Sequence, residues 1–333
     1  MSGRGRTLPA ALIGTVFRRA RPDEIPECGR IWRDSINDYI RPLGQPEIPD
    51  ELAGIGRLHA HTRSTDPERF IVAVRPGEDG ERIVGFGSAL VRGAPGLGRG
   101  PFWYLSMLFV RPETQGEGLG RTLLERLLPE PAFEGALAVA VDSLQPISAA
   151  LYGRFGMVPR SPVLDLTGSI ERPDAFPELP SGVVPVAFET IADGPPDGPG
   201  PRELSAAVDA LDLEVIGAEH PQDHRFVRLE GRRGYLYRGP DGSAMGYGYA
   251  GAVGRIGPVA VRDPGLLDAV VGHLAGAVPA RGATAIWAHG DAPRLVATLL
   301  AAGLRIDGFP LLLCWDRPFL DLTRYLPLSP GLP

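Results

Sequence analysis

The chain has 333 residues, enough for two domains or one large one, and its 44% hydrophobic and 22% charged residues exclude global disorder. The formal charge of −6 argues against nucleic acid or an anionic membrane as the main partner. All 34 basic residues are arginine, because the sequence contains no lysine. This excludes a P-loop phosphate lysine, a Schiff-base lysine and a lysine general base.

Cysteine usage and hydropathy indicate the compartment. Cys28 and Cys314 are the two cysteines, far apart in sequence, so we expect neither a disulfide framework nor a thiolate metal site. Arg18 and Arg19 end the N-terminal apolar run too early for a secretion signal. No apolar stretch approaches the roughly 20 residues of a membrane span. We expect a cytoplasmic protein.

Apolar periodicity and turn residues predict alternating strands and helices in the first half. In chain order, we expect strands at 16–20, 69–74, 83–91, 104–110, 136–141 and 163–166, and helices at 23–36, 51–61, 121–128 and 147–155. Strands joined first by hairpins and later by helices predict a mixed α/β sheet, antiparallel early and parallel late.

The same order recurs after a Pro-rich linker at 171–182. Strands are expected at 183–188, 234–238, 244–252, 256–261, 283–288 and within 304–315, and helices at 203–216, 266–274 and 294–302. Gly156 and Gly303 end equivalent helices, and Arg111 and Arg262 follow equivalent strands. We interpret this as an internal duplication, with two unrelated α/β units as the alternative. The predicted divisions are 1–170, the linker 171–182, 183–318 and a tail at 319–333.

A glycine-rich loop between a strand and a helix carries the strongest chemical signal. Glycines permit positive φ and close approach of a ligand, and the N–H groups from Gln115 to Arg121 converge at the positive end of a helix dipole. This arrangement suits a phosphate or pyrophosphate. A dinucleotide site is the obvious rival, because Asp142 ends the next strand. Its G-x-G-x-x-G spacing fails: counted from Gly116, the third glycine position holds Arg121.

The pattern that fits is Q-x-x-G-x-G, formed by Gln115, Gly118 and Gly120. With it, residues 16–167 resemble the GNAT superfamily of acyl-CoA-dependent N-acyltransferases. The later segment from Ala149 to Met157 is similar to the family's tyrosine-bearing helix, with glycine four residues after Tyr152. The resemblance implies two GNAT-like domains in tandem, the first catalytic at 1–170 and the second degenerate at 183–318.

The resemblance also implies roles for individual residues. Tyr152 would protonate the departing CoA thiolate, and Gln145 stands where the family often has an asparagine that touches pantetheine. Leu108, Phe109 and Val110 would offer main-chain partners to pantetheine, and N–H groups there could stabilise the oxyanion. The pyrophosphate would be held by the backbone of Gln115, Gly116, Glu117, Gly118, Leu119, Gly120 and Arg121.

A general base is not evident. Family members often carry a carboxylate where this chain has Ser106, so we expect attack by a neutral amine or proton loss through water. Glu68, His61 and Asp142 are possible relays. His59 and His61 are expected on a surface helix, with a place in the lining of a substrate pocket as the alternative.

His220 and His224 could share a metal, but Pro221 lies between them and no third ligand is obvious in the sequence. We therefore expect a solvated loop there and no metal site.

The second half lacks the predicted phosphate loop and the acid. No Q-x-x-G-x-G follows Val261, and Leu299 occupies the position that corresponds to Tyr152. The interpretation is an acetyl-CoA-dependent N-acetyltransferase that acts on a primary amine, as a monomer or homodimer without nucleic acid or membrane partners. A small cationic amine is favoured as the acceptor, and a peptide N-terminus or a protein lysine stays open. The alternative is a non-catalytic acyl-CoA-binding or regulatory protein.

Overall fold

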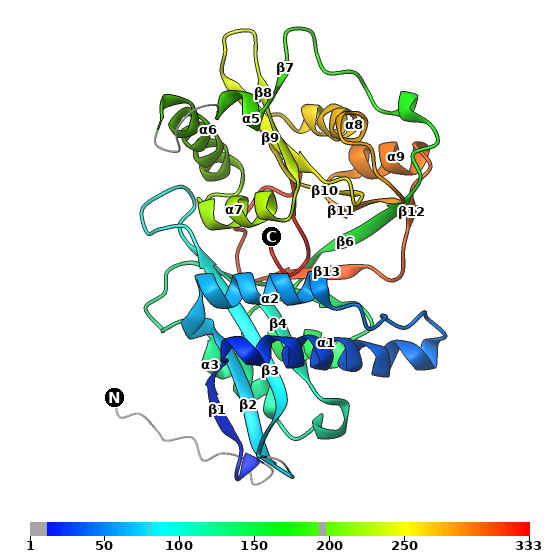
Figure 1. The fold of residues 1–333 in the computed structure, drawn as a ribbon. Helices are drawn as coiled ribbons and strands as arrows, with labels where there is room; N and C mark the ends of the chain where they lie inside the picture. The colour runs from blue at the N-terminus through cyan, green and yellow to red at the C-terminus, as the bar shows by residue number, and fades with distance from the viewer. Residues whose placement is uncertain (1–11, 79, 193–197) are drawn as a thin grey trace. The chain divides into compact units, whose positions relative to one another are not determined.

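The computed structural model describes residues 12–78, 80–192 and 198–333 (Figure 1). The chain divides into two compact units, each described by itself: unit 1 comprises Met1–Val91 and Trp103–Phe133, and unit 2 comprises Arg92–Phe102 and Glu134–Pro333. The start of the N-terminal apolar run lies outside the described residues. Within the described ranges, none of the helices combines the length and apolar character needed to cross a membrane.

Unit 1 holds the elements of the first half up to α3. They are β1 (Val16–Arg19), α1 (Ile25–Ile40), α2 (Ala53–Thr65), β2 (Phe70–Gly77), β3 (Gly80–Arg92), β4 (Phe102–Val110) and α3 (Leu119–Leu127), with 3-10 turns at Pro22–Glu24, Arg41–Leu43, Pro67–Arg69 and Pro112–Thr114. The sheet order is β1-β2-β3-β4, and both β1 with β2 and β2 with β3 pair antiparallel.

Helices cover both faces of this sheet because successive strand residues point to opposite sides. Helices α1 and α2 lie side by side across β2 and β3 (Figure 1). His59 of α2 contacts Phe70 and Phe86 there. Leu119 and Leu123 of α3 pack with the alternate residues of the strands on the other face, among them Ala73 and Val84.

Unit 2 holds the end of the first half and the whole second half. Its elements are β5 (Ala136–Asp142), α4 (Pro146–Gly153), β6 (Val158–Gly168), β7 (Val184–Ala187), α5 (Phe188–Ile191), α6 (Pro199–Val215), α7 (Pro221–Leu229), β8 (Arg233–Arg238), β9 (Ala244–Ala250), β10 (Arg255–Val261), α8 (Leu267–Ala277), β11 (Thr284–His289), α9 (Pro293–Ala301), β12 (Arg305–Ile306), β13 (Leu311–Trp315) and β14 (Tyr325–Leu326), with 3-10 turns at Pro173–Ala175 and Pro264–Leu266. The sheet order is β5-β13-β6-β11-β10-β9-β8-β7. β10 and β11 pair parallel, whereas β8, β9 and β10 pair antiparallel, which confirms the predicted mixed sheet.

The two halves exchange their last strands. β13 of the second half pairs with β5 of the first, and β6 of the first half pairs with β11 of the second, all antiparallel. Leu311 lies opposite Asp142, and Val163 lies opposite His289; Leu311 and Val163 also lie opposite each other in the β6–β13 ladder. The ladder is therefore symmetric about that last pair. This symmetry confirms the internal duplication.

Three features differ from the sequence prediction. β6 is much longer than residues 163–166, because two exchanged strands use it as a ladder partner. Helix α7 was not predicted. The predicted tail is not a solvated end: β14 pairs antiparallel with β10, and Tyr325 and Leu326 are fully buried.

The compact units do not follow the predicted divisions. The boundary after Phe133 falls inside the region 1–170, because β5 and β6 are hydrogen-bonded to strands of the second half. The divisions at 170 and 182 describe the repeat and stay a prediction. The exchange of strands between the two halves determines which residues belong to each compact unit.

His59 is a core residue and not a surface one, so the expectation of a surface position is wrong. Its side chain is fully buried and neither ring nitrogen has a hydrogen-bond partner among the described residues. Burial lowers the pKa of His59 to about 3. The folded state therefore keeps this imidazole neutral at pH values where the unfolded chain, with a pKa near 6.5, protonates it.

We expect this difference to destabilise the protein in mild acid. Between pH 7.5 and pH 5 the unfolded state gains a proton at His59 that the folded state does not bind, which costs about 2 kcal/mol. His59→Leu should abolish that part of the pH dependence. Urea unfolding followed by tryptophan fluorescence at the two pH values tests this, with Phe86→Leu as a packing control that keeps the wild-type pH dependence. Parallel pH dependence in wild type and His59→Leu would contradict the assignment.

Candidate functional site

The predicted phosphate loop of unit 1 connects β4 to α3 through the turn Pro112–Thr114. Gly116 and Gly118 adopt left-handed φ values of 82° and 93°, a conformation that a side chain would strain. Gly120 lies inside the helix, and a Cβ there would meet only Val110 at 3.8 Å. The two glycines at 116 and 118 are thus required by the backbone, whereas Gly120 is not.

Backbone donors collect at the start of α3. Among the described residues, the N–H groups from Gly116 to Arg121 have no acceptor. Thr122 is the first to donate into the helix, to the Gly118 carbonyl at 3.0 Å. Gln115 was predicted to offer its N–H group to the pyrophosphate, but this N–H donates to the Pro112 carbonyl at 3.2 Å. The Gln115 side-chain amide donates to the Val110 carbonyl at 3.1 Å. Gln115 therefore shapes the turn, and the unused donors lie beyond it.

The arginines around the loop are paired with carboxylates. Arg121 contacts Glu125 at 3.0 Å in the same helix, with its side chain half exposed. Arg75 contacts Glu117 of the loop. An entering phosphate would compete with Glu125 for Arg121, while the backbone donors need no rearrangement.

The end of β4, predicted to face pantetheine, is half-buried at Leu108, Phe109 and Val110. The Val110 carbonyl already accepts from the Ser35 hydroxyl at 2.9 Å as well as from Gln115. This leaves Leu108 and Phe109 as the better candidates for a main-chain partner. Ser106, on the same strand, is buried.

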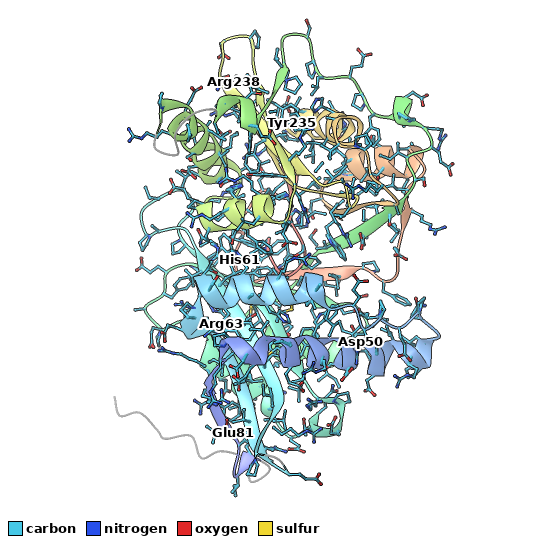
Figure 2. All side chains as sticks on the ribbon, in the orientation of Figure 1. Asp50, His61, Arg63, Glu81, Tyr235 and Arg238 are labelled. Atoms are coloured by element: carbon cyan, nitrogen blue, oxygen red, sulfur yellow. The ribbon has the colours of Figure 1, made fainter. Side chains whose placement is uncertain are left out.

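The suggested proton relays lie in different surroundings. Glu68 forms an exposed ion pair with Arg19. Asp142, in unit 2, accepts from the Leu144 N–H at 2.9 Å at the end of β5. His61 lies on α2, where Figure 2 labels it together with Arg63, whose guanidinium donates to the Ala20 carbonyl.

Tyr152 and Gln145 are both on or beside α4 in unit 2. Gln145 is the residue before the helix, and its N–H donates to the Asp142 carbonyl at 2.9 Å. Burial, together with the nearby Cys314 thiol, raises the pKa of Tyr152 well above 10, although a hydrogen bond with Ser148 opposes the shift. A phenol with an ordinary pKa near 10 is already protonated at neutral pH, so burial leaves Tyr152 in that state and makes it a weaker acid.

A polar pocket of about 380 Å³ opens in unit 1 beside α1 and the segment after it. Arg33 forms ion pairs there with Asp34, at 2.8 Å, and with Asp50, which is labelled in Figure 2. Arg41 forms an ion pair with Glu47. The pocket is lined by Arg33, Asp34, Asn37, Asp38, Arg41, Glu47, Ile48 and Pro112. Three carboxylates against two guanidinium groups favour a cationic guest.

In the described part of the second copy, the connection from β10 to α8 is shorter than the loop of the first copy. β10 leads to α8 through the short turn Pro264–Leu266, and the Asp263 carboxylate accepts from the Gly265 N–H at 2.9 Å. A carboxylate at this helix start would repel a phosphate. Leu299, the counterpart of Tyr152, is fully buried.

The expectation of a solvated loop at His220 and His224 is wrong. Both side chains are buried, at the start of α7 and within it, beside Asp212 of α6. Their spacing of four residues places them on one helix face, a signal that the sequence carries. Asp212 could not be found from the sequence, because the turn between α6 and α7 brings it there.

Comparison with known proteins supports the assignment of the first copy. Residues 31–157 match the model of the acetyltransferase (GNAT) family. No curated protein sequence matches the chain.

Solved structures show that the fold of both copies recurs together. A proposed acetyltransferase from Pyrococcus horikoshii is similar over 96% of each chain, with 16% identity and a TM-score of 0.67. A GCN5-related N-acetyltransferase from Sphaerobacter thermophilus is similar over 96% of this chain and 100% of its own, with 20% identity and a TM-score of 0.57. A tandem GNAT protein from the clavulanic acid biosynthesis pathway shares 17% identity over 91% of this chain and 99% of its own, with a TM-score of 0.52. Residues 31–157 therefore match the GNAT acetyltransferase family, and the chain as a whole has a fold that recurs in tandem GNAT proteins.

Proposed function

We propose that the protein transfers an acetyl group from acetyl-CoA to a primary amine through a ternary complex. The observation that carries the proposal is the row of N–H groups from Gly116 to Arg121, which have no acceptor among the described residues. These donors lie at the positive end of the α3 dipole, where a pyrophosphate is stabilised. Leu108 and Phe109, just before the loop, are proposed to bind pantetheine through their main chain.

Tyr152 is proposed as the general acid. Attack of the amine on the thioester carbonyl expels a CoA thiolate, which must gain a proton. The buried phenol keeps its proton at neutral pH, and a positioned acid typically accelerates such a step by about 10²–10⁴. Gln145, at the start of the same helix, is proposed to contact the pantetheine arm.

We propose that the amine enters as the neutral species or loses its proton to water. Ser106 occupies the position of the usual carboxylate and cannot deprotonate an ammonium group by itself. The same substitution favours the second candidate, an acyl-CoA-binding protein without turnover. Release of free thiol from acetyl-CoA, measured across a panel of small primary amines, distinguishes the two functions.

The pocket beside α1 is proposed to hold the acceptor. Asp34, Asp38 and Glu47 outnumber the arginines that line it, so a cationic small molecule is favoured over a neutral one. Asp38 is exposed at the pocket wall and is the carboxylate chosen for testing.

Gly118→Val tests the phosphate loop. The left-handed φ of 93° disfavours any side chain there, so the donors should move out of line. We expect the Kd for CoA, measured by calorimetry, to rise at least about tenfold, or about 1.4 kcal/mol. Gly231→Val, at another left-handed glycine with open space around it, controls for backbone strain and should bind CoA normally. An unchanged Kd in Gly118→Val would refute the loop assignment.

Tyr152→Phe tests the acid. We expect kcat to fall by about 10²–10⁴ while the Kd for CoA stays unchanged, because only the proton donor is lost. Tyr325→Phe is the matched control, since Tyr325 is also buried in unit 2 and its hydroxyl has no partner among the described residues. Equal kcat values for Tyr152→Phe and wild type would exclude the assigned role.

Asp38→Asn tests the acceptor pocket. Loss of one negative charge should raise KM for the best amine of the panel roughly two- to fivefold and leave KM for acetyl-CoA unchanged. Glu51→Gln removes an exposed carboxylate outside the pocket lining and is the control. If both variants raise the amine KM equally, the effect is one of net charge and not of the pocket.

A further inference from the structure

Three potential metal ligands meet inside the second copy. Asp212 lies near the end of α6, and His220 and His224 lie at the start of α7 and within it. The three side chains are 0%, 2% and 4% exposed. One ligand atom from each lies within 4.8 Å of the other two. Such a cluster is unusual because charged and imidazole groups are rarely buried without a compensating partner.

The ring nitrogens converge on one carboxylate oxygen. Asp212 Oδ2 is 2.8 Å from His224 Nε2 and 3.4 Å from His220 Nε2. The two imidazole rings stack, with centroids 4.6 Å apart. Bonds of 2.0–2.2 Å to a tetrahedral ion would separate its ligand atoms by about 3.3 Å. The His220 distance already matches this spacing, and the His224 distance needs to open by about half an ångström.

The outer groups hold these ligands in the orientation that a metal site needs. The Tyr247 hydroxyl donates a hydrogen bond of 2.6 Å to Asp212 Oδ1, which leaves Oδ2 directed at the histidines. The Tyr249 hydroxyl lies 3.0 Å from His224 Nδ1. Metal-bound histidines commonly use their second nitrogen in this way, which fixes the ring and its tautomer.

The ring nitrogens of His220 are a second observation that points to a ligand. Both of its ring nitrogens are buried, and neither forms a hydrogen bond with any described residue. Its Nδ1 is 3.7 Å from Asp223, whose carboxylate is held by Arg92 at 2.6 and 2.9 Å. A cation bonded to Nε2 would satisfy the inner nitrogen and strengthen the attraction of the outer N–H to Asp223.

We propose that Asp212, His220 and His224 bind a divalent transition-metal ion, with zinc as the ion that suits two imidazoles and a carboxylate. The ligand atoms are Oδ2 and the two Nε2 atoms. The ion would tie the end of α6 to α7 and to β9 through Tyr247 and Tyr249. The three side chains leave the fourth position of a tetrahedral ion to a water molecule. The degenerate copy would thereby carry a site that the first copy lacks. The competing account is an ion pair between Asp212 and a protonated histidine.

Metal content of the full chain tests the proposal directly. Protein purified from zinc-supplemented culture should contain one zinc ion per chain by inductively coupled plasma mass spectrometry. Chelator-stripped protein should gain several degrees in Tm when Zn²⁺ is added. Addition of Co²⁺ instead should produce a visible absorption band typical of low-coordinate nitrogen and oxygen ligation. Zinc-free protein whose Tm does not respond to Zn²⁺ would overturn the proposal in favour of the ion pair.

Variants locate the ion. His220→Asn should lower zinc affinity at least tenfold and abolish the Co²⁺ band, since one ligand is lost. His289→Asn is the matched control, because His289 is also buried in unit 2 with no hydrogen-bond partner among the described residues, and it should keep the metal. If His220→Asn does not fold, Asp212→Asn replaces it, with the same expected loss. Retention of zinc by the folded ligand variant refutes this location.

Discussion

The exchange of last strands is the constraint on which unit 2 depends. Among the described residues of unit 2, the ladder partners of β6 are β11, β12 and β13, all from the second half. Unpaired strand groups inside a sheet are costly because their N–H and C=O groups lose water without gaining a partner. The second copy is thus indispensable to the first as a source of backbone hydrogen bonds, whatever its own chemistry. It supplies these hydrogen bonds although it has no Q-x-x-G-x-G pattern after Val261 and has Leu299 at the position of Tyr152.

The proposed site residues are divided between the two compact units. The proposed phosphate loop belongs to unit 1, where two left-handed glycines precede the start of α3. Tyr152 belongs to unit 2, where burial raises the pKa of its phenol. The proposed reaction therefore draws on a backbone feature and on a side chain that the sequence marks by its spacing from Gly156. The surroundings of Tyr152 hold Cys314 of β13, whose pKa burial raises to about 12, so the exchanged strand contributes to the environment of the proposed acid.

Local signals predicted most of the elements, and long-range pairing did not follow from them. Pro112 and the leucine face after Gly120 located the loop and α3, and Gly156 and Gly303 marked matching helix ends. α7 was missed because Pro221 was interpreted as a break, although proline is favoured at the first position of a helix. The buried position of Asp212, and the pairing of β13 with β5, depend on contacts between distant segments. Apolar periodicity within a window carries no information on such contacts.

The symmetric ladder has a consequence for assembly. A chain that contained only one copy would have to find the complementary last strand on another molecule, so its folding would depend on protein concentration. The segment of residues 171–182 turns that encounter into an intramolecular event at a high effective concentration. The two halves of the tandem chain therefore pair as two subunits of a strand-exchanged homodimer would, but within one molecule. Their sequences can differ, because each half always meets the same partner.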